Sequence, residues 1–121
     1  MILEYAGVHN SAYLIRQGEI ILLKTDSHPI GEPFLNEFCS YKNKEEVLQT
    51  GDSIFLFTDG YIDQFGGLEG KKFLSKNFRK LLIEIQSMTM TEQKEKLYDV
   101  FEEWRGNEVQ TDDVLVMGIR I

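Results

Sequence analysis

The sequence predicts an α+β fold in which an antiparallel β-sheet carries two helices packed on one face. In the first half of the chain, short apolar stretches alternate with turn residues, as in strands. Near residue 70 the apolar period changes to that of a helix, and the last residues return to a strand pattern. Runs of strands followed by helices favour an α+β domain over a doubly wound parallel sheet. We expect five or six strands.

The first three strands are predicted at residues 2–6, 12–16 and 19–24. The second and third flank Gln17-Gly18, a two-residue connection in which glycine supplies the positive φ that tight hairpin turns require. Residues 12–24 are therefore expected to form a β-hairpin.

Two further strands are predicted in the middle of the chain, around residues 35–42 and at residues 53–58. The turn pair Gly51-Asp52 precedes the second of them. Its apolar run is uninterrupted, as in a buried strand.

Two helices and a closing strand follow. The first helix is predicted over residues 71–86, where apolar residues fall on one face: Leu74, Phe78, Leu81, Leu82 and Ile85. The second begins at a capping box formed by Thr89 and Glu92, and Gly106 is well placed to end it. The last strand is predicted over residues 113–121 and must return to the sheet that the helices cover.

Composition bounds the class of protein. With 121 residues and 42% hydrophobic residues, the chain has room for one modest folded domain. The net charge of −7 disfavours binding to nucleic acid or to an anionic membrane. The single cysteine, Cys39, fits a reducing compartment, and no signal peptide or membrane-spanning run is present. We expect a cytoplasmic protein.

Two acidic segments carry the candidate chemistry. Asp59 follows the strand predicted at 53–58, and Asp112 with Asp113 leads into the last strand. A carboxylate at the end of a buried strand has a fixed backbone, and Mg²⁺ and Mn²⁺ prefer oxygen ligands of this kind. Gly60 lets the chain turn without a side chain blocking a cleft. The alternative interpretation is an ordinary Asp-Gly turn and a pair of surface acids.

Taken together, the motifs resemble those of SpoIIE-type phosphatases, which belong to the metal-dependent phosphatase superfamily related to protein phosphatase 2C. The resemblance is carried by Thr58-Asp59-Gly60, by Asp112-Asp113 before the last strand, and by the segment from Leu3 to Asn10. Pro29-Ile30-Gly31 resembles a loop of the family as well. One departure is Leu115, because the family often has threonine two residues after its acid pair.

This resemblance implies a partial phosphatase fold with two helix layers around two sheets, and it implies roles for the acids. Asp59 and Asp112 would be ligands of Mg²⁺ or Mn²⁺, with Gly60 and Asp113 as supporting residues. The family's site holds two ions, and a central bridging Asp comes from an earlier Asp-Gly motif. Asp59-Gly60 is the only Asp-Gly in the sequence. Residues 1–121 are therefore expected to form a single partial domain, the C-terminal part of the phosphatase domain, with weak metal binding and no activity when isolated.

Two classes of function remain open. The first is an enzyme, a metal-dependent serine/threonine protein phosphatase whose substrate is a phosphoprotein, in this family often an anti-sigma-factor antagonist. An upstream sensor or regulatory domain is expected in the full-length protein. The second is a non-catalytic interaction or dimerisation module with the same fold. Because a partial domain leaves strand edges or an apolar sheet face uncovered, the isolated chain is expected to form a homodimer.

Overall fold

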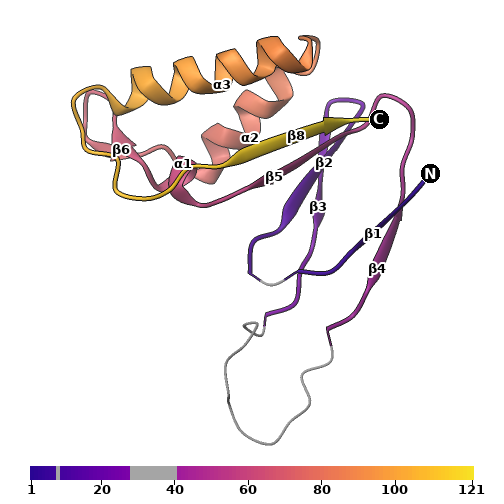
Figure 1. Ribbon diagram of the computed structural model, residues 1–121. Helices are drawn as coiled ribbons and strands as arrows, with labels where there is room; N and C mark the ends of the chain where they lie inside the picture. The colour runs from indigo at the N-terminus through magenta and orange to yellow at the C-terminus, as the bar shows by residue number, and fades with distance from the viewer. Residues whose placement is uncertain (8, 28–40) are drawn as a thin grey trace, which may run out of the picture.

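The computed structural model describes residues 1–7, 9–27 and 41–121. An antiparallel four-stranded sheet has the strand order β3-β2-β5-β8. These strands are β2 (Ala12–Arg16), β3 (Glu19–Leu23), β5 (Ser53–Phe57) and β8 (Val116–Arg120). Figure 1 shows α2 (Ser75–Glu84) and α3 (Met90–Arg105) together on one side of this sheet. The predicted α+β class, with two helices on one face, is confirmed.

Two small strand pairs and one short helix complete the secondary structure of the described residues. The strands β1 (Ile2–Tyr5) and β4 (Lys44–Val47) form an antiparallel pair of their own, which Figure 1 shows away from the helices. The four-residue helix α1 (Gly60–Asp63) follows β5. The short strands β6 (Phe65–Gly66) and β7 (Lys71–Lys72) pair with each other.

The expectation of one sheet with five or six strands is wrong for the described residues. The strands divide into one sheet of four and two sheets of two, because β1 pairs with β4 and not with the larger sheet. Most of the strand predicted around 35–42 lies outside the described residues. The strand β4 was not predicted, since its sequence Lys-Glu-Glu-Val has no apolar alternation.

Other boundaries follow local backbone features. The predicted hairpin is confirmed, and both Gln17 (φ 50°) and Gly18 (φ 80°) adopt the left-handed conformation of its turn. The first helix begins later than predicted, at Ser75, because Leu74 has a φ of 74° and interrupts helical geometry. The second helix keeps its predicted capping box at Thr89 and ends at Gly106.

The helix side of the sheet is filled by aromatic rings. Tyr61 of α1 lies at the centre, in contact with the rings of Phe73, Phe78 and Phe101. Its hydroxyl group donates a 2.7 Å hydrogen bond to the carbonyl oxygen of Leu97. Burial raises the pKa of Tyr61, so this hydroxyl group stays a donor. The short helix after β5 is thereby fixed against α3.

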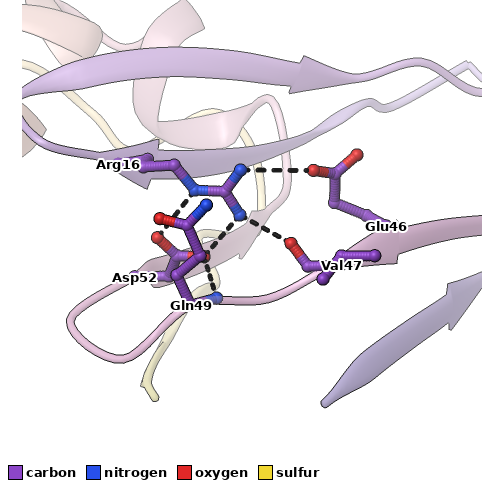
Figure 2. Close-up of polar contacts among 5 residues, drawn as sticks. All are labelled: Arg16, Glu46, Val47, Gln49 and Asp52. Atoms are coloured by element: carbon purple, nitrogen blue, oxygen red, sulfur yellow. Dashed lines mark hydrogen bonds and ion pairs between the residues drawn. The ribbon is translucent and has the colours of Figure 1, made fainter.

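The opposite side of the sheet has a second, smaller apolar cluster, formed by Leu14, Leu23, Leu48 and Ile54. Beside it, Arg16 of β2 reaches the segment between β4 and β5 (Figure 2). Its guanidinium group donates to both oxygens of Asp52, at 3.0 and 2.7 Å, and to the carbonyl oxygen of Val47 at 2.7 Å. The backbone N–H of Gln49 also donates to Asp52. This ion pair fastens the end of β4 to the four-stranded sheet.

Among the described residues, no helix is both long enough and apolar enough to cross a membrane.

Candidate metal centre

The two acidic segments lie at the same end of the four-stranded sheet. Asp59 comes just after β5 ends, and Asp112 and Asp113 come just before β8 begins. Because β5 and β8 are antiparallel neighbours, with Phe57 opposite Val116, the end of one strand meets the start of the other. The fold thus places together two segments that lie far apart in the sequence.

Thr58 holds these segments together. Its backbone N–H donates a 3.0 Å hydrogen bond to the carbonyl oxygen of Leu115. Its hydroxyl group donates to the carbonyl oxygen of Asp113 at 2.9 Å and accepts from the N–H of Leu115 at 3.0 Å. We call these three bonds the Thr58 clamp. Leu115 contributes to the clamp through its backbone alone, so the clamp does not require threonine at that position.

Gly60 is required by the closeness of the two segments. A Cβ atom at this position would lie 2.2 Å from the carbonyl oxygen of Asp113, a distance that no side chain can adopt. The glycine of the Asp-Gly pair therefore lets the acidic loop before β8 pack directly on the start of α1. The backbone carbonyl group of Asp59 accepts the first hydrogen bond of this helix, from the N–H of Asp63 at 2.9 Å.

The acidic side chains at this end are open to solvent. Asp59, Asp112 and Asp113 are all exposed, and one oxygen of Asp112 accepts the N–H of Asp113 at 2.7 Å. Exposed carboxylates on two adjoining segments are the donors that Mg²⁺ and Mn²⁺ prefer. Within the described ranges, no group of three or more His, Cys, Asp or Glu could hold a metal ion. The donors present fit one side of a divalent-cation site, and the ligand roles of Asp59 and Asp112 stay predictions.

The clamp can be tested by removing its hydroxyl group. We expect Thr58→Val to lower the free energy of unfolding by about 1–2 kcal/mol, since two hydrogen bonds are lost. NMR spectra should show amide shifts at Gly60 and Asp113 in this variant. Thr58→Ser keeps the hydroxyl group and should leave both the stability and these shifts near those of the parent chain. Equal behaviour of the two variants would contradict the clamp.

Comparison with known proteins identifies the family to which this chain belongs. The SpoIIE family, Stage II sporulation protein E, matches residues 2–121, and the chain belongs to this family. The SiaA-PP2C domain of Pseudomonas aeruginosa is 31% identical, with a TM-score of 0.85; the match covers 99% of this chain and 46% of that chain. No curated protein matches the sequence.

Two structures of the cell fate determinant SpoIIE from Bacillus subtilis share the fold at lower identity. One contains the PP2C phosphatase domain and a fragment of the regulatory domain, and it is 19% identical with a TM-score of 0.65. The match covers 93% of this chain and 31% of that chain. The other is the phosphatase domain presoaked with manganese, which is 18% identical with a TM-score of 0.54. This match covers 92% of this chain and 46% of that chain. This chain therefore spans less than half the length of each of the three matched structures.

Proposed function

We propose that this chain forms one side of the metal centre of a Mg²⁺- or Mn²⁺-dependent serine/threonine protein phosphatase. Asp59 and Asp112 would be its metal ligands, and Gly60 and Asp113 would support their position. The observation that carries the proposal is the Thr58 clamp, which joins the two acidic segments in a member of the SpoIIE family. The manganese presoak of the related SpoIIE crystal supports the choice of metal.

When bound, the divalent cations would activate water for attack on the phosphorus atom of a phosphomonoester and neutralise its oxygens. The contribution of this chain is to position two carboxylates. The sheet and the clamp already fix the backbone near them, so the binding of a cation costs little further backbone entropy. The exposed carboxylates leave the phosphoprotein free to approach from solvent.

We further propose that residues 1–121 are the C-terminal part of a longer phosphatase domain and are inactive when isolated. A site with two cations needs carboxylates that bridge them, and no group of three or more His, Cys, Asp or Glu among the described residues could hold a metal ion. The chain also matches less than half of each related structure. The remaining ligands would come from the part of the domain that is not matched.

The proposed setting is cytoplasmic signalling. The substrate would be a phosphoprotein, for which an anti-sigma-factor antagonist is the proposed candidate, and a regulatory domain would control the phosphatase. The regulatory domain named for the related SpoIIE structure supports this last point. We also propose that the isolated chain forms a homodimer through the sheet face opposite the helices, where Leu56, Met117 and Ile119 are exposed.

Manganese binding tests the site without requiring activity. Because Mn²⁺ is paramagnetic, adding it to the chain should broaden the NMR signals of Asp59, Gly60, Asp112 and Asp113 before others. In Asp59→Asn or in Asp112→Asn, the same broadening should require a Mn²⁺ concentration at least roughly tenfold higher. Glu103→Gln, which changes an exposed acid on α3, is the matched control. Uniform broadening across all exposed acids would overturn the ligand assignment and favour a non-catalytic interaction module.

A further inference from the structure

The β6–β7 hairpin, residues 64–73, lies beside the candidate metal centre. It follows α1, and because α1 begins directly after Asp59, its last residue Asp63 lies only about 6 Å from Asp59 along the helix. The side-chain amide nitrogen of Gln64 donates a 3.1 Å hydrogen bond to the carbonyl oxygen of Val109, shortly before Asp112. The hairpin is therefore bonded to both acidic segments. Figure 1 shows β6, α1 and the segment that leads into β8 at the same end of the molecule.

Contacts with Trp104 of α3 hold the hairpin in place. The N–H of Gly67 donates to the carbonyl oxygen of Trp104 at 2.8 Å, and the indole N–H of Trp104 donates to the carbonyl oxygen of Gln64 at 3.0 Å. A Cβ atom at Gly66 would lie 1.8 Å from the carbonyl oxygen of Trp104, so the hairpin packs directly on the end of α3. The N–H of Phe73 also donates to Gln64, at 3.0 Å, which closes the base of the hairpin. A partner that binds such a fixed element loses little entropy in ordering it.

The tip of the hairpin presents an apolar side chain to solvent. The N–H of Gly70 donates to the carbonyl oxygen of Gly67 at 3.4 Å, and Leu68 lies inside the turn that this bond closes. Leu68 is 108% exposed, the highest value among the large apolar residues described. Phe65, at the start of the hairpin, is 43% exposed. An isolated exposed leucine is ordinary, but on a fixed tip beside a site that has to admit a protein it offers apolar area for binding.

The hairpin and the start of α2 are basic, although the net charge of the chain is −7. No acidic residue lies between Glu69 and Glu84, whereas the basic residues of this interval, all exposed, are Lys71, Lys72, Lys76, Arg79 and Lys80. Lys71 pairs with Glu69, and Lys72 pairs with Asp63 at 3.0 Å. Both ion pairs are exposed and contribute little to stability, so the two lysines can exchange these partners for the acids of a ligand.

We propose that the β6–β7 hairpin docks the phosphoprotein substrate through the residues that flank its phosphorylated side chain. Leu68 contacts an apolar residue of that segment, and Lys71 and Lys72 contact its acidic residues. Because α1 alone separates the hairpin from Asp59, a few residues of extended chain reach from the metal centre to the tip. The inference rests on the proposed phosphatase function and adds a substrate class to it, phosphorylated segments with acidic and apolar neighbours.

Other occupants of this surface fit less well. A nucleic acid or an anionic membrane presents an extended anionic surface, which the net charge of −7 repels. A second copy of this chain is acidic as a whole, but it would have to bring its own acidic residues to a hairpin that lies beside Asp59 and Asp112. A short phosphorylated segment can place its phosphate at the metal centre and its flanking acids on the lysines.

The binding experiment uses the 121-residue chain, labelled with ¹⁵N and kept in EDTA so that metal binding plays no part. The probe is a short synthetic peptide with a central phosphoserine flanked by leucine and glutamate residues. We expect it to shift the amides from Gly67 to Lys72 before those of α3. A matched peptide with lysine in place of each glutamate should bind at least about fivefold more weakly.

Two variants test the two parts of the surface. Leu68→Ser and Lys71→Glu change exposed side chains, and each should weaken binding of the acidic phosphopeptide at least about fivefold. Tyr98→Ser removes an exposed aromatic ring from α3, and Lys96→Glu reverses an exposed charge there. These two matched controls should bind as the parent chain does. Amide spectra of the free variants check that the fold is kept.

Several results would overturn the proposal. They are an absence of shifts in the hairpin, equal binding of the two peptides, or equal binding by the parent chain and both hairpin variants. Tighter binding of a short single-stranded DNA would assign the surface to nucleic acid, and hairpin shifts that depend on the concentration of the chain alone would assign it to a second copy. Failure of the manganese test would remove the metal ligands without changing these binding results, and failure of docking would leave the metal ligands in place.

Discussion

Asp52→Ala is expected to give the largest loss of stability of any single substitution considered for this chain. The Asp52 side chain is 2% exposed, and it accepts two hydrogen bonds from Arg16 and one from the backbone of Gln49. Without Asp52, Arg16 keeps only Glu46 and the carbonyl oxygen of Val47, and the loss of the buried partner of an ion pair is strongly destabilising. We expect the midpoint of thermal unfolding, measured by circular dichroism, to fall by roughly 5–15 °C.

Glu46→Ala is the matched control, because Glu46 contacts the same guanidinium group at 3.5 Å but is far more exposed. An exposed ion pair contributes little, so the midpoint should change by less than about 3 °C. If the two variants lost the same stability, the geometry of the Arg16–Asp52 pair would not be what stabilises this region.

The same pair makes stability depend on pH. The hydrogen bond from Arg16 lowers the pKa of Asp52 below its ordinary value of 3.8. A lowered pKa in the folded state gives stability that is present above pH 4 and is lost as the pH falls through the folded-state pKa. Hydrogen bonding by the backbone of Lys42 lowers the pKa of Asp26 as well, so both acids contribute. In Asp52→Asn the loss of stability below pH 4 should become smaller, and an unchanged pH profile would refute its assignment to Asp52.

The second large effect concerns phosphatase activity. The isolated chain should hydrolyse nitrophenyl phosphate or a phosphopeptide poorly or not at all in Mn²⁺, because no group of three or more possible ligands among the described residues could hold a metal ion. Joining it to the unmatched part of the SiaA-PP2C domain should restore metal-dependent turnover. In that chimera, Asp59→Asn should lower kcat/KM at least about 100-fold, more than the loss usually caused by altering an outer-shell partner.

Glu103→Gln in the same chimera is the control and should keep full activity, since this residue lies on α3 and is exposed. Robust turnover by the isolated 121 residues, abolished by Asp59→Asn, would show that these residues already form a working site. Turnover in the chimera that is insensitive to both Asp59→Asn and Asp112→Asn would remove the metal-ligand proposal.

The predictions that succeeded depend on neighbours in the sequence. The hairpin at residues 12–24 is set by Gln17-Gly18, and the start of α3 is set by Thr89 and Glu92, three residues apart. An uninterrupted apolar run was sufficient to place β5, and the change of apolar period near residue 70 gave the α+β class. Predictions failed where local pattern and structure diverge, as in the polar strand β4 and at Leu74, whose positive φ delays the start of α2.

By itself, the sequence determined the class of fold, the order of the main elements and the two acidic segments that resemble the SpoIIE family. Only the tertiary structure decided what these residues contact. In the sequence Asp52 is expected to be a turn residue, but its side chain pairs with Arg16, 36 positions away. Thr58 donates a hydrogen bond to Asp113, 55 positions away. Propensity and periodicity act over one turn or one strand, whereas these contacts form only when the sheet brings distant segments together. For this reason the sequence alone did not predict the clamp, the ion pair or the packing of the β6–β7 hairpin on Trp104.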